Sequence, residues 1–285
     1  MARKKLDTRS LGLDVGLAYI KWLTGAENLH YGYWKDIPVC AANLERAQAA
    51  YTELLFARLP DAPCRILDIG GGAGETARKL IALGHSVEIV VPSPFLAGRC
   101  RENAPEAVVH EAMFEDAVLT GPFDVCMFSE SFQYIPLDQG LAKCLDLLAP
   151  HGRIVIADCF RSETFQSDKV MATAGGGHPI ARFRTKLQEL GLQADQEIDV
   201  TAAVAPSIDL EQGLFNVIGY AMTRVDGELA DKRPKIRRAI RWTLRRLLSE
   251  RRRVRLDQRL NQQTRNAANF EKNNTYLMLQ LQRAG

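Results

Sequence analysis

The 285-residue sequence has few cysteines, and their arrangement excludes two common uses of that residue. Six are present, but none forms a C-x-x-C pair and no histidine cluster accompanies them. We therefore expect neither a metal site nor a disulfide framework, and scattered thiols favour a reducing cytoplasm. The six are Cys40, Cys64, Cys100, Cys126, Cys144 and Cys159.

Long apolar runs are also missing. No run reaches the roughly 18 residues that a membrane span requires. The basic stretch at residues 1–10 has no apolar segment behind it, so we expect no secretory signal. Internal repeats and low-complexity linkers are absent too. A hydrophobic content of 46% with 25% charged residues is typical of a globular chain and excludes general disorder.

Charge is distributed unevenly along the chain. The net charge is +3, yet residues 231–285 carry a balance of +12 and residues 1–230 a balance of −9. An acidic body therefore carries a basic C-terminal segment.

Short apolar runs alternate with helical periodicity after residue 64, which predicts a doubly wound α/β fold with a mostly parallel sheet of seven strands. Such sheets bind ligands at the carboxyl ends of their strands. The predicted strands are Ile66–Ile69, Val87–Val91, Ala107–His110, Phe123–Phe128, Arg153–Ala157, Ala194–Val200 and Thr275–Gln282. The predicted helices between them are Gly74–Leu83, Ser93–Asn103, Leu137–Leu148 and Ile180–Leu190.

Four parts follow from this pattern. Residues 1–60 form a helical N-terminal lid, and residues 61–205 form a Rossmann-like core. Residues 206–272 form a basic helical insertion, and residues 273–285 return to the core as its last strand.

The most informative stretch reads Arg65-Ile-Leu-Asp-Ile-Gly-Gly-Gly-Ala-Gly74. A buried strand ends near Asp68, and a tight glycine turn then opens a helix. Glycines let the backbone approach a ligand closely, and a helix N-terminus offers unpaired N–H groups. Dinucleotide-binding folds use a similar loop, so this stretch alone does not decide the ligand.

Further motifs follow in order: Phe114-Glu-Asp116, then a strand whose exit loop reads Phe128-Ser-Glu-Ser-Phe132, and then Leu148-Ala-Pro-His-Gly-Arg153 leading into another strand. Together with the glycine loop they resemble class I S-adenosylmethionine-dependent methyltransferases of the small-molecule type. Sarcosine and tocopherol methyltransferases and cyclopropane fatty acid synthases are similar.

The resemblance implies S-adenosylmethionine as cofactor and a role for each matching residue. Its methionine and ribose part would lie against Asp68, Gly70, Gly72 and Gly74. Asp116, with Phe114 or Glu115 beside it, would meet the adenine. Ser129 and Glu130 would lie near the methionine end and the substrate.

One position departs from the family pattern. Members usually have an acid at the end of the second strand, where it binds the ribose hydroxyls, but this chain has Val91 there. Glu88 comes three residues too early. Either Ser93 or another polar group holds the ribose, or cofactor binding is weakened or altered.

Substrate contacts are expected from two further segments. The aromatic stretch around His30-Tyr-Gly-Tyr-Trp34 resembles the family's lid, in which Tyr31 and Tyr33 would close over the substrate; packing of the N-terminal helices is the alternative. Phe132 is a further candidate for substrate binding. Candidates for proton removal are Glu130, His178 and Tyr31. Glu130 could equally be a surface residue, and a lone loop histidine such as His178 is more often one.

The basic segment 232–259 carries 13 Lys and Arg against two acids, with one apolar helical stripe. It could be a lid helix packed on the body, rest on an anionic membrane with Trp242 at the interface, pair with an acidic substrate, or bind RNA. Nucleic acid is the weakest of these, since the body is acidic and contains no recognisable RNA-binding module. The sequence leaves the oligomeric state undefined.

These observations predict a cytoplasmic enzyme. If the basic segment rests on an anionic membrane, the enzyme is also in contact with a membrane surface. It would transfer methyl groups from S-adenosylmethionine to a small organic molecule, acidic or lipid-like, in biosynthesis. The alternatives are an RNA methyltransferase that uses the basic helix and a non-methylating protein that keeps the fold.

Overall fold

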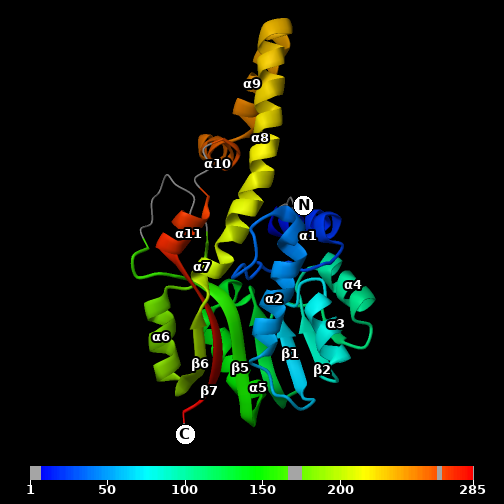
Figure 1. The fold of residues 1–285 in the computed structure, drawn as a ribbon, viewed down its shortest axis with the longest axis vertical. Coiled ribbons are helices and arrows are strands. Elements are labelled where there is room, and N and C mark those ends of the chain that lie inside the picture. Colours follow the sequence, from blue (N-terminus) through cyan, green and yellow to red (C-terminus); the bar gives the residue numbers. More distant parts are fainter. Residues whose placement is uncertain (1–7, 166–174, 262–264, 285) are drawn as a thin grey trace, which may run out of the picture.

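A computed structural model of the chain describes residues 8–165, 175–261 and 265–284. Its centre is one seven-stranded sheet in the order β3-β2-β1-β4-β5-β7-β6, shown in Figure 1. This confirms the predicted α/β fold. The strands are β1 (Arg65–Ile69), β2 (Ser86–Val90), β3 (Val108–His110), β4 (Phe123–Ser129), β5 (Leu148–Arg161), β6 (Leu192–Asp199) and β7 (Asn274–Arg283).

Strands β1 to β5 are parallel, and β7 runs antiparallel to both of its neighbours, β5 and β6. The order runs one way from β1 to β3 and the other way from β4 to β5. Neighbouring β1 and β4 therefore mark the switch point where open sheets form a ligand crevice. The fifth strand begins five residues earlier than predicted, because Leu148 pairs with Phe123 before the register shifts.

Helices cover both faces of the sheet, as apolar side chains on both sides of its strands require. On one face lie α2 (Leu44–Phe56), α3 (Glu75–Ala82) and α4 (Pro94–Asn103), and on the other α5 (Leu137–Leu147) and α6 (Ile180–Glu189). The four predicted core helices are confirmed to within two residues at each end.

The N-terminal region joins α1 (Thr8–Thr24) to α2 through the aromatic loop. Trp34 is buried and donates from its indole Nε1 to the Ser207 hydroxyl at 2.9 Å, and the Gly32 N–H donates to the same oxygen at 3.0 Å. The loop is therefore anchored to the start of the helix Pro206–Lys232, which follows β6.

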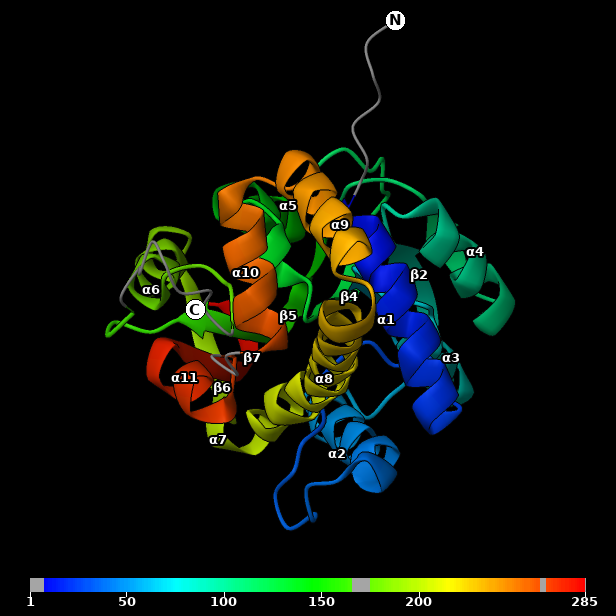
Figure 2. The same cartoon turned by 90° about the horizontal axis from the view of Figure 1, so that it is seen from above.

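The insertion between β6 and β7 is helical, as predicted. It consists of α7 (Thr201–Val204), α8 (Pro206–Lys232), α9 (Pro234–Leu247), α10 (Glu250–Leu260) and α11 (Ala267–Asn273). We call α8, α9 and α10 the arm. Figure 1 shows α8 rising far from the body with α9 returning beside it, and Figure 2 looks down on the arm above the body.

The arm starts at a defined edge of the sheet. Because β6 and β5 are both antiparallel to β7, β6 ends at the same edge as the parallel strands, and α7 and α8 follow it there. In the part of the chain that the structure covers, no helix is long and apolar enough to cross a membrane.

Candidate active site

A cavity of about 340 Å³ lies at the carboxyl ends of β1, β2 and β4. Its walls come from the loops that follow β1, β2, β3 and β4, together with residues 27–30 and Leu13 of α1. The cavity thus occupies the switch point of the sheet, with the N-terminal region as one wall.

The glycine turn after β1 is shaped by positions that only glycine fits well. Gly70 has φ +80°, and a Cβ there would lie 2.3 Å from the Ser131 Cβ. Gly74, the residue before α3, has φ +85°, and a Cβ there would lie 2.9 Å from the Cys100 Cα. Without side chains at Gly70 and Gly74, the loop packs closely against Ser131, just after β4, and against Cys100 of α4. Gly70, Gly72 and Ala73 line the cavity.

Asp68 lies at the end of β1, where its carboxyl group meets the cavity. The side chain is almost fully buried, and its Oδ2 has no hydrogen-bond partner among the described residues. Burial raises the pKa of Asp68 to about 7. A Cβ at Gly71 would lie 2.7 Å from this oxygen, so glycine leaves the carboxyl group room. An unsatisfied buried oxygen beside a cavity is suited to a ligand that donates hydrogen bonds or carries positive charge.

Glu130 lies at the exit of β4 with φ +58°, uncommon for a residue other than glycine. Its Oε1 accepts from the Tyr31 N–H at 2.8 Å and from the Tyr276 hydroxyl at 3.0 Å. Tyr51 extends the network, with its hydroxyl 2.7 Å from that of Tyr276 and 3.3 Å from the Ser129 Oγ. Burial raises the pKa of Glu130 to about 8, although both hydrogen bonds oppose this.

The loop after β3 supplies an aromatic ring and a carboxylate to the cavity. Phe114 and Glu115 line it, and Glu115 Oε2 is buried with no hydrogen-bond partner among the described residues. Asp116 is exposed and outside the lining residues, because the turn from Met113 to Ala117 directs it to solvent. Of the predicted adenine contacts, the structure brings Phe114 and Glu115 to the cavity and not Asp116.

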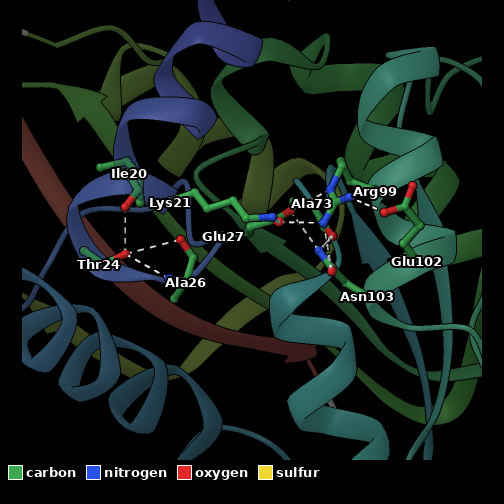
Figure 3. Close-up of polar contacts among 9 residues, drawn as sticks. All are labelled: Ile20, Lys21, Thr24, Ala26, Glu27, Ala73, Arg99, Glu102 and Asn103. Carbon is green, nitrogen blue, oxygen red and sulfur yellow. Dashed lines mark hydrogen bonds and ion pairs between the residues drawn. The ribbon is translucent and has the colours of Figure 1, made fainter.

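A buried carboxylate that the sequence did not indicate, Glu27, lies in the N-terminal wall, as Figure 3 shows. Glu27 accepts from the Arg99 Nε at 2.9 Å, from the Lys21 Nζ at 2.5 Å and from the Asn103 Nδ2 at 2.9 Å. Burial alone would raise the pKa of Glu27, but these bonds outweigh it and lower the pKa to about 2. Asn103 also donates to the Ala73 carbonyl at 2.9 Å. The network ties α1 and α4 to the glycine turn.

The comparisons with known proteins agree with this geometry. Residues 40–197, more than half of the chain, match the family described as "Methyltransferase domain". The chain belongs to this methyltransferase family. The resemblance drawn from the glycine loop and the motifs after it is therefore confirmed.

Two relatives in sequence are also named as methyltransferases. Methyltransferase GfsG of Streptomyces halstedii is 26% identical to this methyltransferase over 214 residues, which cover 67% of this chain and 75% of that protein. An uncharacterised methyltransferase of Geobacillus kaustophilus is 30% identical over 140 residues, covering 47% of this chain and 65% of that protein.

Solved structures share the fold over nearly the whole chain. Cyclopropane synthase MmaA2 from Mycobacterium tuberculosis has a TM-score of 0.69 at 15% identity, and the match covers 94% of this chain and 95% of the synthase. Geranyl diphosphate C-methyltransferase from Streptomyces coelicolor has 0.64 at 15% identity, covering 98% and 99%. The [4+2]-cyclase SpnF has 0.61 at 15% identity, covering 95% and 96%. These likenesses establish the architecture.

At the ribose position of this methyltransferase, Val91 is buried and lines the cavity, as does Ser93. The Ser93 hydroxyl caps α4 by accepting from the Leu96 N–H at 3.3 Å. Glu88 does not line the cavity. Its carboxylate instead pairs with Arg65 at 2.5 Å and with His110 at 2.7 Å. No acid from β2 therefore reaches the cavity.

The two lid tyrosines lie behind the cavity wall. Tyr31 packs edge-on against Phe270 and tilted against Tyr276, each at 6.3 Å between ring centroids. Tyr33 packs against the same core. Leu29 and His30 line the cavity instead, while Tyr31 contributes its backbone N–H to Glu130. This arrangement corresponds to the packing alternative, in which the aromatic residues hold the N-terminal region on the sheet.

His178 and Phe132 also lie outside the cavity lining. The His178 Nε2 is 3.0 Å from the Ile135 carbonyl and 3.2 Å from the Phe132 carbonyl. Both partners accept, so this nitrogen carries the proton. Burial lowers the pKa of His178. Phe132 is fully buried among aromatic rings, including Phe128 at 5.2 Å. Both residues therefore stabilise the loop that follows β4, and neither contacts the cavity.

Proposed function

We propose that this methyltransferase takes the methyl group of S-adenosylmethionine and transfers it to a small organic molecule. The observation that supports this most directly is a set of cavity-lining residues with buried oxygens that lack hydrogen-bond partners among the described residues: Asp68 Oδ2, Asn28 Oδ1 and Glu115 Oε2. All three are acceptors. A cofactor with an ammonium group, a sulfonium and an adenine amino group brings matching donors and positive charge.

The residues present fit that cofactor. The turn at Gly70 and Gly72 would hold its methionine part together with Asp68, while Phe114 and Glu115 would hold the adenine. Val91 would contact the ribose, with Ser93 as the nearest polar side chain of the same loop. When bound, S-adenosylmethionine supplies a methyl group that its sulfonium has already activated for displacement.

Glu130 would accept the proton of an oxygen or carbon nucleophile. Its Oε1 is held by two donors, and a pKa near 8 makes it a usable base in neutral to mildly alkaline solution. An amine nucleophile would not require this step. For every acceptor, the cavity contributes by holding the reacting atoms in line and excluding water.

We further propose that the substrate is acidic or lipid-like and belongs to biosynthesis. A rival is a non-methylating protein of this fold; Val91 in place of a ribose-binding acid favours it, and a structural neighbour is named a [4+2]-cyclase. The second rival, an RNA methyltransferase, rests on the basic segment alone.

Calorimetric titration with S-adenosylmethionine tests the site. We expect Asp68→Asn to weaken binding by about tenfold to a hundredfold, because it removes a charge-assisted contact. Glu88→Gln is the matched control, a carboxylate on the neighbouring strand whose partners Arg65 and His110 lie away from the cavity, and it should leave affinity unchanged. Equal affinities of wild type and Asp68→Asn would remove Asp68 from the site. Binding without turnover on any pool of small molecules would favour the non-methylating rival.

A further inference from the structure

The arm exposes two apolar stripes that no described part of the body covers. On α8 the residues recur at spacings of four and three, and on α9 at spacings of four, four and three, so each set lies along one side of its helix. Their exposed fractions run from 41% to 71%. The residues are Ile218, Met222 and Val225 on α8, and Ile236, Ile240, Leu244 and Leu247 on α9.

Ion pairs fix how the two helices face each other. Asp226 of α8 pairs with Arg237 of α9 at 2.7 Å and with Arg241 at 3.0 Å. At about 100° per residue, each apolar stripe is centred roughly 80° of rotation away from these pairs on its own helix. Because α9 runs back along α8 (Figure 1), both rotations turn the stripes to the same side of the hairpin. The seven residues thus form one surface, which we call the arm face.

The part of the arm that follows α8 is also strongly basic. Residues 232–259 hold 13 Lys and Arg against two acids. Within the described chain, neither Arg238 nor Arg245 has an ion pair. Four of the other cations pair with acids of α8, and these are Lys232, Arg237, Arg241 and Arg259. Among the described residues, Arg238 and Arg245 therefore keep a positive charge that no ion pair balances.

We propose that the arm face docks on the surface of an anionic lipid membrane. An apolar helical face with a basic remainder is the pattern of helices that lie in the headgroup region. Charge decides between this partner and a second copy of the chain, since two arms brought face to face would repel each other, whereas a negatively charged bilayer attracts every unpaired arginine. The inference concerns binding and is independent of methyl transfer.

Trp242 lies about 160° around α9 from the centre of the apolar stripe, so it is outside the arm face. The Arg246 guanidinium lies 5.0 Å from its ring centroid.

The arm extends away from the body. No residue of α9 is buried, so the helix is not packed on the body as a lid. Since α8 is about 40 Å long and starts at the edge that holds the cavity, docking would keep the cavity mouth within that distance of the lipid.

Co-sedimentation of the full chain with vesicles tests the proposal. We expect binding to vesicles of phosphatidylcholine mixed with phosphatidylglycerol, little binding to phosphatidylcholine alone, and weakening as salt is raised. Ile240→Glu should reduce the partition coefficient by on the order of tenfold or more, because it puts a charge on the apolar face. Arg238→Gln and Arg245→Gln should each reduce it by about twofold, because both lie on the side of α9 away from the apolar stripe, where the attraction of the lipid is weaker.

Val118→Glu is the matched control, since Val118 is 91% exposed on the body, and it should bind like the wild type. Far-ultraviolet dichroism shows whether each variant keeps its helices, and the two arginine variants test the proposal even if Ile240→Glu unfolds the hairpin. Failure of the wild type to bind anionic vesicles would overturn the proposal. So would a dimer in lipid-free solution that Ile240→Glu dissociates, or tight RNA binding that Ile240→Glu retains and the arginine variants lose.

Discussion

The Tyr276 hydroxyl donates to Glu130 Oε1 at 3.0 Å, which joins the last strand of the chain to the exit of β4. The same hydroxyl lies 2.7 Å from that of Tyr51 on α2. Three segments that are far apart in the sequence are therefore joined through the Tyr276 hydroxyl. Since Glu130 also has a left-handed backbone and a half-buried side chain, the network holds it in one orientation.

The raised pKa of Glu130 predicts a pH dependence of stability. The native state keeps a proton up to about pH 8, whereas the unfolded chain releases it near its ordinary pKa of about 4.3. The contribution of this group is thus fully present below about pH 4 and is lost as pH rises through about 8. Urea unfolding at several pH values should show a weaker decline for Glu130→Gln than for the wild type. Tyr276→Phe retains the carboxyl group and should retain the decline; identical slopes for Glu130→Gln and wild type would contradict the assignment.

Glu27 should stabilise the fold through its partners on two helices, α1 and α4. We expect Glu27→Gln to lower the free energy of unfolding by about 2 kcal/mol, because Arg99 and Lys21 lose a buried carboxylate. The comparison variant is Glu102→Gln, which removes another acid paired with the same Arg99 but exposed to solvent, and it should cost less than about 0.5 kcal/mol. Chemical denaturation of both proteins measures the difference. Equal costs would show that the position of Glu27 in the cavity wall has no energetic weight.

Gly70 should resist substitution more than any glycine on an open helix surface. Gly70→Ala would force φ +80° on an alanine and press its Cβ into Ser131, which we expect to cost about 3 kcal/mol. Gly98 on α4 has open space around its Cα, so Gly98→Ala should instead stabilise by up to about 1 kcal/mol. Thermal unfolding measures both. A neutral Gly70→Ala would mean that the turn can move away from β4.

Val91→Asp tests how the ribose is held. Because Val91 is buried and lines the cavity, an aspartate there would face ribose hydroxyls, and we expect S-adenosylmethionine to bind about tenfold more tightly. The isosteric Val91→Thr supplies a hydroxyl without the charge and should give a smaller gain. Calorimetry without any gain for Val91→Asp would show that another group already satisfies the ribose.

Local sequence was sufficient for those features whose causes are local. The run from Arg65 to Gly74 encodes its strand, its turn and its helix start within ten residues, so Asp68 and the glycine loop were predictable. Glu27 was not, because its partner Arg99 lies 72 residues away and only the fold brings them together. The same holds for Tyr51 and Tyr276, which are 225 residues apart.

The remaining differences between the predicted and the observed site come from the conformation of single turns. Glu115 and Asp116 are adjacent acids, and composition does not reveal which of them the turn after β3 directs inward. His178 has the chemistry of a base, yet two backbone carbonyls within hydrogen-bond distance engage its ring nitrogen. Such pairings depend on loop conformation, which spacing along the chain does not report.

The position of β7 has a consequence for biogenesis. Among the strands that the structure describes, β6 pairs with β7 alone, and β7 is made only after the whole arm. During synthesis on the ribosome, about seventy-five residues are added between the end of β6 and the start of its partner β7. Strands β1 to β5 can already associate during that time. The nascent chain therefore passes through a stage with an open edge at β5, and a stop codon anywhere in the arm would leave that edge permanently unpaired.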